Sequence, residues 1–154
     1  MFRIACNILI GALTIISLST LPGCGYTLRG KVVRGETSSI EMVHEIDSRL
    51  KGPGIMNAEV MVRRDPKSPH PEMVGRTRTG DEGSFAMNIS QFGAGWMEEQ
   101  WLVQAGMTGF TNTQQMSKLP PSGGKWQLLI TLAPGQSSPL DQPDQITQEI
   151  ERYK

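Results

Sequence analysis

The sequence has few residues of the kinds that carry metal or nucleophilic chemistry. Its 154 residues include two cysteines, Cys6 and Cys24, and two histidines, His44 and His70. A catalytic zinc site takes three protein ligands, and His70 with Glu72 would need a Cys-x-x-Cys partner to make a zinc deaminase site. The sequence also lacks a Gly-x-Ser-x-Gly nucleophile elbow. We therefore expect no metal, no cofactor and no enzymatic activity.

An excess of charge of one sign is also missing. Lys and Arg total 15 and Asp and Glu total 15, so the formal net charge is zero. Residues 1–23 contain Arg3 as their one charged residue, which leaves 14 basic against 15 acidic residues after them, a net charge of −1. Nucleic-acid binding needs a basic field. The charge balance therefore argues against a nucleic-acid partner.

One long apolar run is present, at the N-terminus. Arg3 is followed by the almost wholly apolar residues 4–18 and then by Leu21, Pro22, Gly23 and Cys24. A basic start, an apolar stretch and small residues at the cut are typical of an export signal. The last four residues resemble a bacterial lipobox, which implies cleavage before the cysteine and a thioether-linked diacylglycerol on its sulfur.

We accordingly expect residues 1–23 to be a lipoprotein signal helix and Cys24 to be the lipidated residue. Stable anchoring takes two or three acyl chains, because a single chain binds a membrane only marginally. Two alternatives remain open at this stage. Residues 4–21 could form an uncleaved membrane helix, since they approach the roughly 20 residues that span a bilayer, or they could be an ordinary cleaved signal.

Beyond residue 25 the apolar residues alternate with a period of two, which is typical of half-buried strands. Seven strands are predicted, over residues 26–33, 40–47, 58–63, 74–79, 85–89, 101–105 and 126–132. The polar strand over 74–79 is expected at a sheet edge, and residues 111–116 could add a weak eighth strand. Residues 80–83, rich in glycine, are expected to join two strands as a compact hairpin.

The alternation also predicts which side chains face inward. The expected inward side chains include Leu28, Val32, Ile40, Met42, His44, Ile46, Val60, Val62, Phe85, Met87, Ile89, Trp101, Val103, Trp126, Leu128, Ile130 and Leu132. Short strands with this spacing imply two sheets packed face to face. Residues 135–154 are expected to be a flexible tail, with a frayed turn or a small docking helix over 144–153.

Four segments resemble the carboxypeptidase regulatory-like domains: residues 54–62, residues 75–85 with Thr79, Gly83 and Phe85, residues 104–110, and residues 128–132. The resemblance spans residues 26–134. It implies a transthyretin-like (prealbumin-like) Greek-key β-sandwich as the fold of residues 24–134. Two departures are visible, since Gly80 stands where the family often has Asp, and residues 36–51 are longer than the usual first connection.

Trp96 is the candidate partner-binding residue. It follows Gly93 and Gly95 at a loop-to-strand junction, where an exposed indole could stack on a sugar or contact a protein; ordinary packing is the alternative. Trp101 and Trp126 are expected in the core. Asp81 and Glu82 offer too few oxygen ligands for a typical calcium site, and His44 is expected to be a hydrogen-bonded core or interface residue.

The sequence as a whole predicts a non-catalytic lipoprotein of the bacterial cell envelope, on the periplasmic or the outer surface. Its β-sandwich would engage a protein or glycan partner. The alternative is a small-ligand-binding, transthyretin-like accessory subunit of an envelope transport or hydrolytic system.

Overall fold

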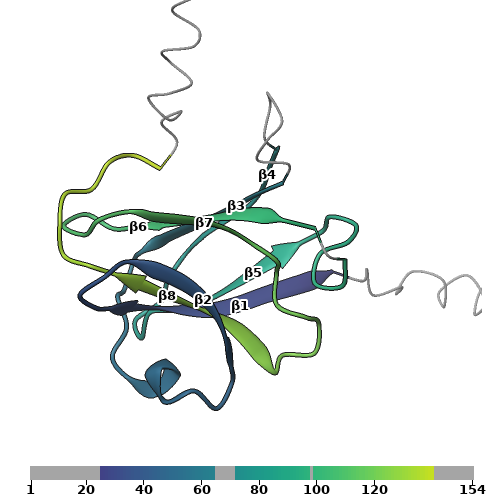
Figure 1. Ribbon diagram of the computed structural model, residues 1–154, viewed down its shortest axis with the longest axis horizontal. Coiled ribbons are helices and arrows are strands. Elements are labelled where there is room, and N and C mark those ends of the chain that lie inside the picture. Colours follow the sequence, from purple (N-terminus) through teal and green to yellow (C-terminus); the bar gives the residue numbers. More distant parts are fainter. Residues whose placement is uncertain (1–24, 65–71, 98, 141–154) are drawn as a thin grey trace, which may run out of the picture.

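A computed structural model describes residues 25–64, 72–97 and 99–140, and these fold into two four-stranded sheets that pack face to face (Figure 1). Sheet one has the order β2-β8-β1-β5 and sheet two the order β4-β3-β6-β7. The elements are β1 (Tyr26–Arg34), β2 (Ser39–His44), the 3-10 helix η1 (Ser48–Lys51), β3 (Glu59–Arg64), β4 (Glu72–Arg78), β5 (Ser84–Ile89), β6 (Trp101–Gly106), β7 (Thr113–Ser117) and β8 (Trp126–Leu132).

The predicted all-β architecture is confirmed, with eight strands in the described residues instead of about seven. The eighth strand is β7, which confirms the weak strand suggested over residues 111–116. Its side chains are exposed or half-buried, so its polar sequence carries little alternation. It is an edge strand, paired with β6 alone. The polar strand β4 also lies at an edge, as predicted.

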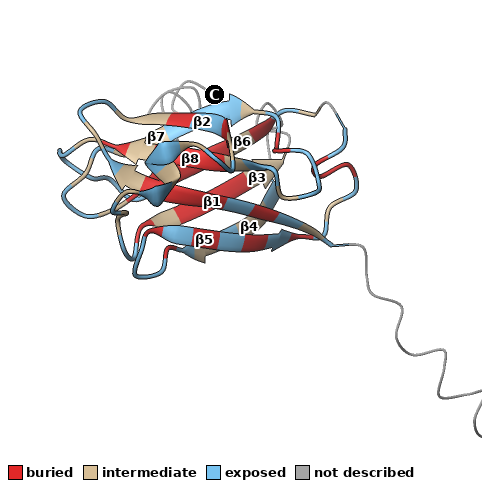
Figure 2. Cartoon of the chain, turned by 90° about the horizontal axis from the view of Figure 1, so that it is seen from below, coloured by how far each residue is buried: buried red, intermediate tan, exposed pale blue. Residues whose placement is uncertain are grey.

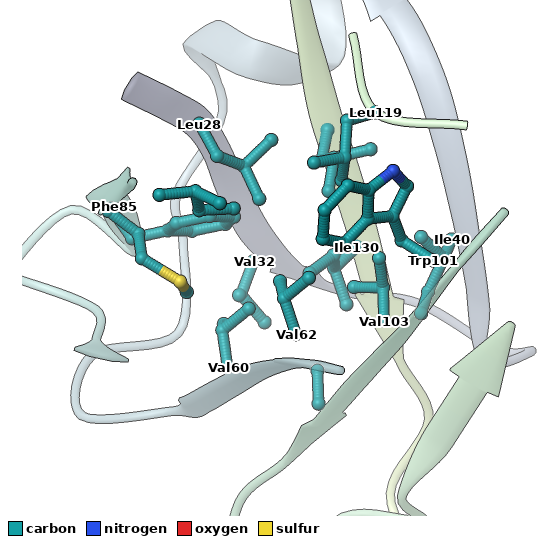
Figure 3. Packing of buried hydrophobic residues seen from close by; sticks show 14 of the residues in the cluster. Leu28, Val32, Ile40, Val60, Val62, Phe85, Trp101, Val103, Leu119 and Ile130 are labelled. Atoms are coloured by element: carbon teal, nitrogen blue, oxygen red, sulfur yellow. The ribbon is translucent and has the colours of Figure 1, made fainter. Parts of the chain in front are cut away.

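The core lies between the two sheets. It is made by the strand residues whose side chains point toward the opposite sheet. Figure 2 shows buried and exposed residues alternating along β5 and along the first half of β1. Figure 3 shows side chains of both sheets meeting in one layer. Among them Leu28, Val62 and Ile130 are fully buried. Burying an aliphatic side chain of this size contributes roughly 1.5–3 kcal/mol, so this layer is the main source of stability.

Gly30 occupies an inward position because Phe85 needs the space. The two residues pair across β1 and β5. A Cβ atom on Gly30 would lie 2.6 Å from Cζ of Phe85, so the ring rests directly on the glycine backbone. The Phe85 ring therefore fills the space that a side chain on Gly30 would occupy.

The hairpin predicted over residues 80–83 is wrong, because β4 belongs to sheet two and β5 to sheet one. The turn is tight, with a hydrogen bond of 2.9 Å from the Gly80 N–H to the Ser84 carbonyl. Gly83 has a φ of 74°, and its carbonyl accepts from the Val32 N–H at 2.8 Å. That bond ties the end of the turn to β1 of sheet one. The chain therefore crosses at this turn from β4 in sheet two to β5 in sheet one.

Three residues expected in the core lie at its rim. Ile46 is 75% exposed, because β2 ends at His44 and Ile46 follows in a turn. Met42 is partly exposed because β2 is an edge strand. Trp126 is 42% exposed, because it is the first residue of β8 and reaches beyond the layer of inward side chains.

Buried apolar residues also lie on the outer faces of the sheets. Val43 and Leu129 of sheet one and Met61 of sheet two are buried although they do not belong to the core cluster. The segment with η1 lies on the outer side of sheet one (Figure 1), and the Lys31 ammonium donates to the Leu50 carbonyl of that segment at 2.9 Å. Strand alternation alone would leave Leu129 exposed to water. The η1 segment, which comes from another part of the chain, shields this outer face of sheet one.

The first residues of the predicted tail contact the sandwich. The Gly135 N–H donates to the Gly109 carbonyl at 3.0 Å, and the Asn112 amide bonds to the Ser138 carbonyl. The helix expected over 144–153 and the signal helix over 1–23 lie outside the described residues. Within the described ranges no helix has the length and apolarity that a membrane span requires.

Candidate functional site

One end of the sandwich carries an exposed aromatic loop. At this end, called the Tyr26 end, β1 and β8 begin and β5 ends, since Tyr26 pairs with Ile89 and β1 runs parallel to β8. Residues 91–97 follow β5 and are called the aromatic loop. Figure 1 shows this loop beside the start of β1.

Two aromatic rings of this loop project into solvent as a pair. Phe92 is 72% exposed and Trp96 is 66% exposed. Their ring centroids are 5.1 Å apart and their planes meet at 87°, an edge-to-face geometry that aromatic rings favour. Met97 is also exposed. The loop therefore presents a ready apolar surface for contact, which we call the aromatic surface: Phe92, Trp96 and Met97.

Short hydrogen bonds give the loop its shape. The Met97 N–H donates to the Gly93 carbonyl at 2.9 Å, and the Trp96 N–H to the same carbonyl at 3.2 Å. Ala94 is buried and belongs to the core cluster. Because Ala94 points inward, Phe92 and Trp96 on either side of it are held outward.

Gly95 joins the aromatic loop to the first strand. Its φ of 78° lies in the left-handed region, and a Cβ atom there would be 2.3 Å from Cε2 of Tyr26. Its carbonyl also accepts from the Ser122 N–H at 3.0 Å. Only glycine combines this conformation with so close an approach, so the loop rests on β1 and on the β7–β8 connection together.

Tyr26 is the central contact of this end. Its hydroxyl donates to the Pro120 carbonyl at 2.7 Å, and burial raises the pKa of its phenol above the usual range. Tyr26 is therefore a neutral, structural residue. It fixes the aromatic loop relative to the N-terminus of the domain.

A groove of about 310 Å³ adjoins the aromatic loop. It runs between the start of β1 and the β7–β8 connection, and Tyr26, Arg29, Ser122 and Trp126 are among its lining residues. The Trp126 ring meets His44 edge to face, with centroids 5.3 Å apart. The groove adds a cationic and a second indole side chain to the Tyr26 end, although the residues of the aromatic surface do not line it.

The opposite end of the sandwich, where β3 and β5 begin and β4 and β6 end, is called the Gly83 end. A second, polar groove of about 400 Å³ lies there. Asn57, Glu59, Arg78 and Asn112 line it. Glu59 accepts from Nε of Arg76 at 2.7 Å and lies 4.0 Å from Nε of Arg78. The charged side chains of the groove are thus already paired with each other. A bound molecule would contact polar groups with little net charge.

The structure separates the residues singled out in the sequence. Trp96 lies exposed in the aromatic surface. Trp101 is fully buried, as predicted, and the prediction that Trp126 is a core residue is wrong. Asp81 and Glu82 are exposed in the β4–β5 turn. Leu21, Pro22, Gly23, Cys24 and His70 lie outside the described residues.

His44 differs from its expectation in one respect. Its Nδ1 is buried and has no hydrogen-bond partner within the described part of the chain, although a hydrogen-bonded histidine was expected. It packs against Trp126 instead. No group of three His, Cys, Asp or Glu residues suited to a metal occurs among residues 25–64, 72–97 and 99–140.

Three residues of this end were not predicted from the sequence: Phe92 and Met97 of the aromatic surface, and Tyr26, which positions the aromatic loop. A signal for two of them was present, because residues 90–97 contain no charged side chain and carry Phe, Trp and Met around two glycines. Tyr26 read as an ordinary inward strand residue. Its contact with Gly95 joins positions 69 residues apart, which no local pattern reports.

No family model matches the chain, and no curated protein matches it. A solved structure similar to it is a 9R-lipoxygenase from Cyanothece PCC8801, with a TM-score of 0.37 and 10% identity. The match covers 82% of this chain and 18% of that one.

Proposed function

We propose that the chain is a non-catalytic lipoprotein of the bacterial cell envelope whose β-sandwich engages a protein or glycan partner. In this proposal a lipid on Cys24 holds the protein at a membrane, on the periplasmic or the outer surface. The observation that carries it is the exposed Phe92–Trp96 pair at the end where the N-terminal segment joins the domain. Rings in this setting offer contact area, and Trp is enriched among residues that dominate binding.

We also propose the finer fold, a transthyretin-like Greek key of the carboxypeptidase regulatory-like kind. The path of β3 to β6 supports it, because the chain leaves β3 and β4, crosses to β5 and returns as β6 beside β3. The roles of the motif residues support it too. The Thr79 hydroxyl joins the end of β4 to residues 55–58 before β3. Gly83 supplies the positive φ of the β4–β5 turn, and Phe85 packs in the core.

Partner binding through Trp96 is tested with the full-length protein, purified in its membrane-anchored form. Isolated cell-wall glycan and solubilised envelope proteins are each offered to the wild type and to Trp96→Ala and Phe92→Ala variants. We expect binding to fall several-fold in both variants. Met56→Ala is the matched control, because Met56 is an exposed apolar residue away from the Tyr26 end. Equal binding by all variants would reject the aromatic surface as the partner site.

The lipid anchor is tested with Cys24→Ser. We expect the wild type to take up labelled fatty acid, to be shortened by signal cleavage and to sediment with membranes. The variant should do none of these. If the wild type takes up no label and is not shortened, and the variant still sediments with membranes, residues 4–21 hold the protein as an uncleaved helix.

A second candidate function is small-ligand binding by an accessory subunit, and the polar groove at the Gly83 end favours it. Glu59, Arg78 and two asparagines offer both donors and acceptors around about 400 Å³. A ligand there would raise the melting temperature by mass action. Thermal shift with a panel of polar metabolites, repeated on Glu59→Gln, tests this function; a shift that persists in the variant would place the ligand elsewhere.

A further inference from the structure

The large exposed hydrophobic residues gather at one end of the molecule. The three most exposed among the described residues are Ile46, Phe92 and Trp96, and all three lie at the Tyr26 end. Met42 and Met56 are the exceptions in the described ranges. Every other large exposed hydrophobic residue lies in a loop of this end, or at or next to a strand terminus there. Scattered apolar residues are ordinary on a protein surface, whereas gathered ones mark a contact.

This end is also where the chain meets the membrane in the proposed function. Two peptide units separate Cys24 from Tyr26, so the lipidated residue lies within about 7 Å of the Tyr26 Cα along the chain. The Tyr26 ring in turn rests on Gly95 of the aromatic loop. The same proximity holds if residues 4–21 stay as an uncleaved helix, because the bilayer would then also end just before Gly25.

The chemistry of the loop suits a lipid surface. Residues 90–97 contain no charged side chain, and the first charged residue after them is Glu98, so insertion of the loop itself desolvates no ion. Trp is enriched at membrane interfaces, where its ring is apolar and its N–H can stay hydrogen-bonded. The charges around the loop are mixed: Arg29 lines the adjoining groove, Glu72 accepts from Gln91, and Glu99 pairs with Arg64.

We propose that Phe92, Trp96 and Met97 insert into the interfacial region of the bilayer that holds the N-terminal anchor. The inference rests on the membrane attachment in the proposed function. It replaces the protein or glycan partner by the bilayer as the occupant of the aromatic surface, so a soluble partner would bind elsewhere on the sandwich. The insertion supplies a second attachment besides the acyl chains, which is how stable peripheral binding is usually reached. It also orients the sandwich, with the Gly83 end and its polar groove directed away from the membrane.

The test is tryptophan quenching in the full-length, anchored protein. The protein is reconstituted into phosphatidylcholine vesicles, with and without bromine on the acyl chains. Trp101 is fully buried in the core, so the two exposed indoles report the environment. We expect strong quenching by the brominated lipid in the wild type, a several-fold smaller effect in Trp96→Phe, and little change in Trp126→Phe. Because the charges are mixed, the quenching should be insensitive to salt.

A matched control places an indole at the other end. In Trp96→Phe with Met56→Trp, the new indole should escape the lipid bromine and remain open to iodide. If the protein sediments with vesicles but Trp96→Phe is quenched as strongly as the wild type, the inference is overturned while the anchor stands. Shielding of Trp96 by added glycan or protein, without lipid quenching, would also overturn it. A chain that does not sediment with vesicles overturns both the inference and the anchor.

Discussion

Thr79 shows how one buried hydroxyl can hold a sequence motif in place. It donates to the Ile55 carbonyl at 2.6 Å and accepts from the Ala58 N–H at 2.8 Å. Its own backbone also bonds to Asn57 and Ala58. The end of β4 is thereby tied to the start of β3, beside the crossing from one sheet to the other.

Replacing Thr79 with Val should therefore destabilise the domain. The Ile55 carbonyl and the Ala58 N–H would both lose their partner, and a buried polar group left unpaired costs about 1–3 kcal/mol. Urea unfolding of the two proteins measures the difference. Thr79→Ser keeps the hydroxyl and should retain most of the stability, so an equally large loss in that variant would contradict the hydrogen-bond explanation.

The burial of Tyr26 leads us to expect that the folded domain loses stability in alkaline solution. Burial raises the pKa of its phenol in the folded state, so the unfolded chain releases this proton at lower pH than the folded chain. Stability is then fully present below the unfolded value of about 10 and declines as the pH rises above it. Melting temperatures between neutral pH and pH 11 should fall more steeply in the wild type than in Tyr26→Phe. Parallel curves would remove Tyr26 as the cause.

At the scale of elements, the aromatic loop depends on two separate demands on Gly95. One is its positive φ, and the other is the approach of the Tyr26 ring. Gly109 shares the first demand without the second, because its φ is 87° and nothing lies within 4 Å of an added Cβ.

Gly109→Ala should cost about 1 kcal/mol, the price of a left-handed conformation for alanine. Gly95→Ala should cost clearly more, because its methyl group also displaces the Tyr26 ring. Denaturant unfolding of the two variants compares them directly. Equal losses would mean that the ring moves aside freely and that the loop is not seated on β1.

At the scale of the whole molecule, stability depends on the layer between the sheets. Ile130→Ala removes a fully buried side chain from β8 and should lower the free energy of unfolding by about 2–5 kcal/mol. Ile46→Ala removes the same atoms from an exposed turn, where surface changes usually stay within about 0.5 kcal/mol. Calorimetry or urea unfolding should separate the two variants widely; similar losses would contradict the assigned burial.

Much of the core could be read from the sequence, because side chains on a strand point alternately to its two faces. That rule placed Leu28, Val60 and Leu128 inside. It failed at Trp126 and Ile46, because alternation describes a direction and does not report where the opposite sheet stops. It also failed at Leu129, whose outward face is covered by a segment from elsewhere in the chain.

The candidate site was predictable only in part. Trp96 was singled out because it follows Gly93 and Gly95 at a loop-to-strand junction, where an exposed indole and ordinary packing were both open. Phe92 was missed because its exposure follows from Ala94 pointing into the core between it and Trp96. Tyr26 was missed because its role is a contact across the fold.

The sequence by itself determined the period of the strands, the positions of the turns and the apolar N-terminal segment, since these depend on neighbouring residues. The tertiary structure alone decided which strands share a sheet. It placed β8 between β1 and β2 and sent the chain from β4 across to β5, because hydrogen bonds such as that from Val32 to Gly83 join residues far apart in the chain. The gathering of exposed aromatic residues beside the N-terminal segment follows from that arrangement.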